Sequence, residues 1–334
     1  MQAILIDGPG TAADLYIGTA PDPAPGPGQV LLHTVAAGVN RADLLQRAGK
    51  YPPPAGASTI LGLEVAGTVI GLGTGVTDYE IGDNVCALVS GGGYAQQIAV
   101  DQEMLLPLPA GMSFTKAAAV PETFLTAYQA LHWIGGLRAG QRVLVHAAAS
   151  GVGTAALQLI RLAGAHAIAT ASAGKHEVCL RLGAERCIDY RSEDFAAAVV
   201  DATDGRGVDL ILDFVGADYW AKNLSSLAPD GKLVLLGLLG GHEVKGFSLT
   251  TLLQRRLTVQ ATTLRSRDRD YQHRLTADFR RDCLPHFATR RLEPVVDTIY
   301  DWNQVDAAHR HLESNETRGN LVLTIGDETE ADWL

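Results

Sequence analysis

The middle of the chain alternates between short apolar runs and stretches whose apolar residues recur at helical spacing. A short run rich in Val, Leu and Ile suits a strand that is buried on both faces. These runs are Arg142–Ala147, Ala165–Ala171, Arg186–Ile188, Val208–Phe214, Lys232–Gly237 and Leu257–Thr262. Because helical stretches lie between most of them, the pattern predicts an α/β fold with a doubly wound parallel (Rossmann) sheet.

The parts on either side of this region look different. The first part carries short strand-like runs separated by Gly and Pro, which predicts a partly open barrel or sandwich. These runs are Val30–Val35, Leu63–Leu72, Asp83–Val89 and Tyr94–Val100. Near the other end, residues 305–312 fit a helix and residues 320–325 fit a strand. We expect this tail to rejoin the first part, so that residues 1–122 and 264–334 form one β-rich domain around a Rossmann domain at 123–263.

The turn after the first central strand has the size and position of a dinucleotide-binding turn. Ala148, Ser150 and Gly153 occupy the places of the Gly-x-Gly-x-x-Gly pattern, with an additional Gly151 followed by Val152. Small residues there let the N–H groups at the start of the next helix approach a pyrophosphate. We therefore assign Ser150, Gly151, Val152 and Gly153 to cofactor binding. The alternative is an ordinary buried strand–helix turn.

The end of the second central strand favours NADPH over NADH. A carboxylate normally binds the ribose 2′-hydroxyl at this place, but Ser172 and Lys175 are found instead. Both can donate hydrogen bonds to a 2′-phosphate, and Tyr190 follows the next strand. Gly216 and Gly237 end two later strands on the edge where ligands bind. The alternative for Lys175 is a solvated surface lysine.

Composition narrows the class of protein. The chain has 334 residues, of which 47% are hydrophobic, and a formal net charge of −10. This charge excludes a general basic footprint for nucleic acid. The four cysteines lack paired spacing, which is typical of free thiols in a reducing compartment. No stretch reaches the roughly 18 apolar residues that suit a membrane-spanning helix, and no leader pattern precedes the first strand. We therefore expect a cytoplasmic protein without membrane contact.

Taken together, the motifs resemble those of a known family. The segments GVNRADLLQRAG, LGLEVAGTV, GGGYAQ and AASGVG occur in the order found in the medium-chain dehydrogenase/reductase superfamily, in its zinc-free quinone oxidoreductase branch. The segments DYWAKNLSSLAPDGKLVLLGLLGG and TLRSRDRDY are similar to those of the p53-inducible quinone oxidoreductase subgroup. The resemblance covers essentially the whole chain. It implies a GroES-like catalytic domain beside the Rossmann domain.

The same resemblance argues against a metal. Asn40 stands where the first cysteine ligand of the zinc-dependent members would lie, Leu63 where the histidine would lie, and Glu122 near the third ligand. Asn and Leu cannot build a catalytic zinc site, which needs three protein ligands. The cysteine cluster of the structural zinc is missing as well. His309 and His311 would point to different sides of a helix, and we expect them to be a surface pair.

The resemblance also implies which side chains face the reaction. Asn40 and Tyr51 would face the nicotinamide, and Thr126 would contact its ribose or amide. These three residues are the candidate catalytic groups, and Asn40 and Thr126 also count as cofactor-binding. The segment Leu264–Ser266, which includes Arg265, would cover the cofactor. The alternatives are a helix-capping Asn, a half-buried Tyr, a buried helical Thr and a hinge loop.

These features favour an NADPH-dependent quinone oxidoreductase that works without zinc. A quinone, and an ortho-quinone in particular, is already electrophilic and needs no Lewis acid. Transfer could proceed as a hydride or one electron at a time. The alternatives are an NADPH-dependent 2-enal or enone (enoyl) reductase and a non-catalytic protein that binds NADPH or RNA.

Oligomerisation is expected through an exposed edge of the parallel sheet. An unpaired apolar edge strand favours pairing with a second copy. The expected segment is near Lys232–Gly237 or Leu257–Thr262. The outcome would be a homodimer or a homotetramer.

Overall fold

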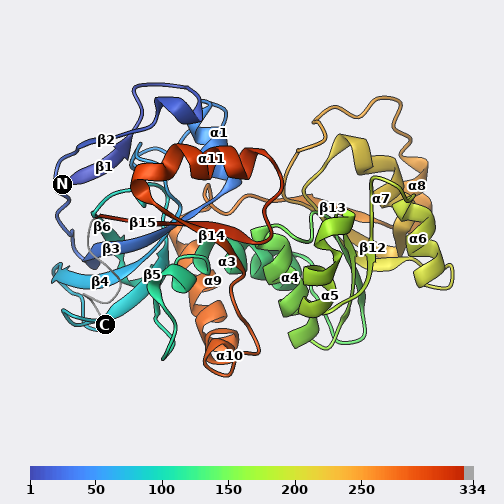
Figure 1. The fold of residues 1–334 in the computed structure, drawn as a ribbon. Coiled ribbons are helices and arrows are strands. Elements are labelled where there is room, and N and C mark those ends of the chain that lie inside the picture. The colour runs from blue at the N-terminus through green and yellow to red at the C-terminus, as the bar shows by residue number, and fades with distance from the viewer. Residues whose placement is uncertain (327–334) are drawn as a thin grey trace. The chain divides into compact units, whose positions relative to one another are not determined.

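The computed structural model describes residues 1–326, which form two compact units. The first unit comprises Met1–Leu125 together with residues 265–326. The second unit is the continuous segment Thr126–Leu264. In Figure 1 the first unit therefore carries both the blue and the red parts of the chain, and the second unit is mostly green and yellow.

The first unit is built on β-sheet. Its strands are β1 (Gln2–Leu5), β2 (Tyr16–Thr19), β3 (Gln29–Val39), β4 (Glu64–Leu72), β5 (Asn84–Leu88), β6 (Gln97–Asp101), β7 (Leu105–Pro107), β14 (Val296–Asp301) and β15 (Asn320–Thr324). A seven-stranded sheet has the order β14-β15-β3-β4-β5-β7, with β6 paired to β3, while β1 and β2 form a separate pair. The tail strand β15 runs antiparallel to β3, with Leu321 opposite Val39. Strands from the two ends of the chain thus share one sheet.

Short helices accompany these strands. They are α1 (Arg41–Arg47), α2 (Phe114–Ala117), α9 (Arg269–Asp282), α10 (Leu284–Ala288) and α11 (Val305–Glu313). The helix α3 (Pro121–Tyr128) spans the boundary between the units and continues into a π-helical turn at Gln129–Ile134.

The second unit is a six-stranded sheet in which every neighbouring pair is parallel. Its strands are β8 (Arg142–Val145), β9 (His166–Thr170), β10 (Ala184–Ile188), β11 (Val208–Asp213), β12 (Leu227–Leu235) and β13 (Thr258–Ala261). The order β10-β9-β8-β11-β12-β13 is that of a doubly wound nucleotide-binding sheet. Its helices are α4 (Gly151–Leu162), α5 (His176–Leu182), α6 (Phe195–Ala202), α7 (Trp220–Ser226) and α8 (Thr250–Arg255). The α/β fold predicted from the apolar runs is confirmed.

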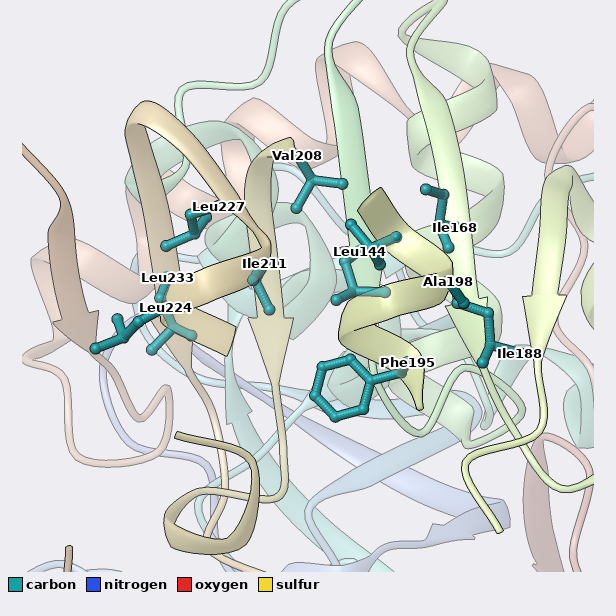
Figure 2. Close-up of a cluster of buried hydrophobic side chains, with 11 residues drawn as sticks. Leu144, Ile168, Ile188, Phe195, Ala198, Val208, Ile211, Leu224, Leu227 and Leu233 are labelled. Atoms are coloured by element: carbon teal, nitrogen blue, oxygen red, sulfur yellow. The ribbon is translucent and has the colours of Figure 1, made fainter. Parts of the chain in front are cut away.

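A cluster of buried side chains holds this sheet to its helices. Figure 2 shows Phe195 and Ala198 of α6 lying over apolar residues of the strands. The buried members of the cluster are Leu144, Ile168, Ile188, Phe195, Ala198, Val199, Val208, Ile211, Leu224, Leu227 and Leu233. Burying each large member contributes about 1.5–3 kcal/mol, which keeps the strand ends of the sheet in fixed positions.

Several predicted boundaries need correction. The strand predicted from Arg142 to Ala147 ends at Val145, because Ala147 adopts a positive φ of 46° that ends the extended run. The strand predicted from Tyr94 begins only at Gln97, and Tyr94 is a fully buried turn residue. The segment Lys232–Gly237 is not a sheet edge, because β12 lies between β11 and β13.

Candidate functional site

The turn before α4 is shaped by glycine and serine. Ser150 is the N-cap residue, and its Oγ accepts a hydrogen bond from the N–H of Gly153 at 3.1 Å. A Cβ at position 153 would lie 2.5 Å from the carbonyl oxygen of Ala147, so only glycine fits there. The N–H groups of Gly151 and Val152 belong to the first turn and have no acceptor within the helix. They can bind an anion such as a pyrophosphate.

A buried hydrogen-bonded network connects residues at the ends of β8, β9 and β11. The Nδ2 of Asn223 donates to Asp213 at 3.1 Å, so its Oδ1 must accept from the Nε2 of His146 at 2.7 Å. The Nδ1 of His146 then accepts from the hydroxyl of Thr170 at 2.9 Å. Burial lowers the pKa of His146 to about 4, which keeps the ring neutral and matches this arrangement. The sequence motifs did not predict this hydrogen-bonded network, because its residues lie far apart in the sequence.

The residues predicted for the 2′-phosphate follow neighbouring strands. β9 and β10 are paired in parallel, so the segments that leave their carboxyl ends emerge at the same edge of the sheet. Ser172 caps the single helical turn that includes Lys175, and both side chains are partly exposed. Tyr190 is 43% exposed, and the guanidinium carbon of Arg191 lies 5.8 Å from its ring centre. This edge therefore presents hydroxyl and cationic groups toward solvent.

Gly216 and Gly237 hold two loops against each other beyond β11 and β12. A Cβ at Gly216, whose φ is +84°, would lie 2.7 Å from the carbonyl oxygen of Gly241. A Cβ at Gly237 would lie 3.0 Å from the carbonyl oxygen of Phe214. Both glycines are thus explained by close packing of backbone at the edge where ligands bind in such sheets.

Thr126 and Leu264 stand at the two ends of the second unit. The Oγ1 of Thr126 is buried and, within the described part of the chain, has no hydrogen-bond partner. A buried hydroxyl of this kind is costly unless a ligand or water satisfies it. Leu264 is buried, whereas Ser266, in the first unit, is exposed.

In the first unit, Asn40 is held by a buried carboxylate. Its Nδ2 donates to Oε1 of Glu64 at 2.8 Å, and the same oxygen accepts from Asn320 at 3.1 Å. The other oxygen of Glu64 accepts from the backbone N–H of Glu122 at 2.9 Å. Burial raises the pKa of Glu64 well above its usual range, while the hydrogen bonds from Asn40 and from the backbone of Glu122 act in the opposite direction. Asn40 is also the N-cap residue of α1.

A second buried hydrogen-bonded network begins at the backbone of Asn40. The carboxylate of Asp43 accepts from the backbone N–H of Asn40 at 2.8 Å and from the hydroxyl of Tyr94 at 3.4 Å. The hydroxyl of Tyr94 also contacts the Nε2 of His309 at 3.3 Å, and Arg47 donates to the Nδ1 of His309 at 3.1 Å. His309 is fully buried, so the expected surface pair of His309 and His311 is wrong. The polar partners of His309 come from distant parts of the chain and gave no local signal.

Tyr51 lies beside Arg265. The guanidinium carbon of Arg265 is 5.4 Å from the centre of the Tyr51 ring. Arg265 donates from Nε and Nη2 to the carbonyl oxygen of Ser90 at 3.0 and 2.7 Å, and from Nη2 to Oε1 of Gln46 at 2.7 Å. Arg265, predicted as part of a cofactor cover, is thus anchored within the first unit. Sequence spacing gave no indication of its contact with Tyr51.

The described residues contain no group of three or more His, Cys, Asp or Glu side chains placed to hold a metal ion. None of their helices is both long and apolar enough to cross a membrane. An open groove of about 520 Å³ lies between α9 and residues 78–103 of the first unit, and no predicted site residue lines it.

Comparisons with known proteins agree with this arrangement. Residues 151–279 match the zinc-binding dehydrogenase family, and residues 26–110 match the alcohol dehydrogenase GroES-like domain. The chain is 34% identical to the synaptic vesicle membrane protein VAT-1 homolog of Rattus norvegicus, over 92% of this chain and 80% of the relative.

Solved structures resemble the chain over nearly its whole length. A quinone oxidoreductase of Pseudomonas syringae has a TM-score of 0.84 and 31% identity, over 97% of this chain and 99% of that one. The CurK enoyl reductase has a TM-score of 0.87 and 27% identity with the same coverage. A mycobacterial protein in complex with NADPH has a TM-score of 0.85 and 29% identity, over 97% of this chain and 100% of that one.

Proposed function

Because the chain belongs to the medium-chain dehydrogenase/reductase superfamily, we propose that it is an NADPH-dependent quinone reductase that works without zinc. The observation that carries the proposal is the environment of Asn40. The resemblance puts Asn40 at the place of a zinc ligand, and its amide donates to Oε1 of Glu64 at 2.8 Å. An amide can donate a hydrogen bond to an acceptor oxygen but cannot serve as the anionic sulfur ligand of zinc. The similarity to a quinone oxidoreductase supports the same reaction class.

A bound nicotinamide cofactor would supply the hydride, and the residues of the second unit would bind it. The N–H groups of Gly151 and Val152 would bind the pyrophosphate, since the first turn of α4 leaves them without helical acceptors. The orphaned hydroxyl of Thr126 would find its partner on the nicotinamide half.

The 2′-phosphate would be bound at the edge formed by the ends of β9 and β10. Ser172 and Lys175 stand where a carboxylate would repel a phosphate, and Tyr190 is exposed nearby along the chain. Charge-assisted hydrogen bonds from Lys175 would make NADPH bind more tightly than NADH.

The acceptor would be oriented by Asn40 and Tyr51. Nδ2 of Asn40 has two hydrogens, of which Glu64 takes one. The second can bind the oxygen of a quinone or an enone. Burial raises the pKa of Tyr51, so its hydroxyl remains protonated at neutral pH and can donate to the same oxygen.

The test is the initial rate of NADPH oxidation with 1,2-naphthoquinone, measured beside NADH and beside a 2-enal. Rapid quinone-dependent loss of NADPH, with NADH a poor substitute, supports the proposal. Equal rates with NADH and NADPH would contradict the proposed preference for NADPH. Absence of turnover with every acceptor would contradict a reductase altogether.

An NADPH-dependent enoyl reductase is the second candidate. The similarity to the CurK enoyl reductase, at a TM-score of 0.87, favours it. Reduction of an enal or enone also delivers a hydride to an electrophilic carbon and a proton to the product. Turnover of the 2-enal without turnover of the quinone would select this activity.

A further inference from the structure

We propose that Arg265 and Tyr51 act as one catalytic pair, in which Tyr51 protonates the acceptor oxygen and Arg265 positions the phenol and stabilises the phenolate. This inference rests on the proposed reductase function and adds Arg265 to its site. The pair is built within the first unit, from the segment after α1 and the segment that precedes α9.

The first observation is the way in which Arg265 is buried. Its side chain is held by Ser90 and Gln46, both of which offer neutral oxygens, and the residue is only 6% exposed. None of the ion pairs among the described residues includes Arg265. A buried cation without an ion-pair partner is costly to a fold. Its neutral anchors fix the guanidinium without cancelling its charge.

The second observation is the unsatisfied nitrogen. The Nη1 of Arg265 is buried and has no acceptor among the described residues, although Nε and Nη2 are both bonded. Buried donors are nearly always paired in folded proteins, so an orphan indicates a partner that arrives later. The electron density that develops on Tyr51 during proton donation is such a partner.

The third observation is the position of Tyr51. Its ring centre is 5.4 Å from the guanidinium carbon, which is within the range of a cation–π contact. A cation at this distance limits the orientations of the ring and favours negative charge on it. The planar fork of the arginine lets two of its nitrogens anchor the side chain while the third remains available.

The charges around Tyr51 act in two directions. Burial raises the pKa of Tyr51, Glu122 raises it further, and Arg265 lowers it. Burial lowers the pKa of Arg265, whereas the charges of Asp43 and Glu122 oppose this shift and favour its charged form. At neutral pH the phenol is therefore the resting form, while Arg265 reduces the free energy needed to release its proton.

The proton balance of the step is simple. Bound NADPH would supply a hydride to the acceptor carbon, and the electron pair displaced from the conjugated C=O system would move to the acceptor oxygen. The O–H bond of Tyr51 breaks, its proton passes to that oxygen, and the phenolate remains beside Arg265. A water molecule then returns a proton to Tyr51 and completes the turnover.

The direct test measures the pKa of Tyr51 by NMR on protein labelled with ¹³C in its tyrosine rings. Tyr51→Phe identifies the signal. We expect Arg265→Met to raise this pKa, and Arg265→Lys to leave it close to that of the parent. Arg280→Met is the matched control, because Arg280 contacts the hydroxyl of a different tyrosine, Tyr79, at 3.3 Å. An unchanged Tyr51 pKa in Arg265→Met would overturn the pair.

The kinetic test uses the same variants with NADPH and 1,2-naphthoquinone or the 2-enal. We expect Arg265→Met to lower kcat by roughly tenfold or more, with the KM for NADPH little changed. The double variant with Tyr51→Phe should lose no more than Tyr51→Phe alone, because the two groups act in one step. Independent, multiplying losses would contradict the shared step.

The two tests separate failure of the pair from failure of the proposed function. If the parent reduces quinones but the pKa of Tyr51 is the same in the parent and in Arg265→Met, the pair is wrong and the function stands. If the pKa shifts in a parent that reduces no acceptor, the contact is real but both the proton-donor role and the function are refuted. If Arg265→Met fails to fold, Arg265→Gln takes its place, because it removes the charge but keeps a donor for the carbonyl oxygen of Ser90.

Discussion

Asn40 keeps its amide in one orientation because both oxygens of Glu64 act as acceptors. One oxygen serves Asn40 and Asn320, and the other serves the N–H of Glu122. The sequence singled out Asn40 through a family resemblance, but it could not reveal Asn320 as a neighbour. Such partners are brought together only by the pairing of β15 with β3. Residues with local motifs were therefore predictable, and their long-range partners were not.

Replacing Glu64 with Gln should destabilise the first unit by about 1–3 kcal/mol, because an amide N–H₂ would face at least one existing N–H donor. Loss of kcat should accompany it, since Asn40 would be free to rotate. Urea unfolding at neutral pH measures the first effect, and quinone turnover measures the second. Glu80→Gln, at an exposed position, is the control. Equal stability of the two variants would contradict the role given to Glu64.

His146 should make the second unit sensitive to mild acid. Its pKa is about 4 in the folded chain and near 6.5 when unfolded, so the unfolded state takes up the proton first as the pH falls. Stability that is present above pH 6.5 is then lost between about 6.5 and 4, by up to about 3 kcal/mol. Urea midpoints across this range should vary less in His146→Gln than in the parent. An identical pH dependence in both proteins would rule out this contribution.

At the scale of elements, the candidate site depends on where strands end. The ends of β8, β9 and β11 carry the turn before α4, the segment Ser172–Lys175 and the loop at Gly216. Apolar runs predicted these strands well, because strands buried on both faces leave a continuous signal. The helix α9 left no such signal, since Leu275, Thr276 and Phe279 are its only buried residues within a largely charged sequence.

Lys175→Ala should raise the KM for NADPH roughly tenfold and leave the KM for NADH nearly unchanged, because only NADPH carries the 2′-phosphate. Lys222→Ala is a suitable control in the same unit, since Lys222 pairs with Asp194 at the surface. Steady-state kinetics with both cofactors provides the measurement. If Lys175→Ala changes the KM for NADPH and the KM for NADH equally, the lysine does not bind the 2′-phosphate.

At the scale of the whole molecule, the parallel sheet ends in two edge strands, β10 and β13, and we expect pairing with a second copy at β13. β13 is the last strand of the order and presents exposed residues at Thr258, Gln260 and Ala261. Nearby in sequence, Leu253 is 81% exposed. An exposed edge with apolar surroundings favours pairing with a second copy about a twofold axis.

We expect the parent to be a dimer by light scattering, and the double variant Thr258→Lys with Gln260→Lys to shift toward monomer. Like charges would face each other across the twofold axis, which opposes edge pairing. Ile299→Lys on β14, at an edge of the other sheet, should remain dimeric. A monomeric parent would refute the assembly.

The placement of β15 between β14 and β3 has a consequence for biosynthesis. Its residues leave the ribosome long after those of β3, so the large sheet of the first unit stays open at that position until β15 has emerged. The second unit is continuous and can fold on the ribosome before then. During that interval β3 exposes the edge that β15 later covers, and chaperones that bind nascent extended segments would act there.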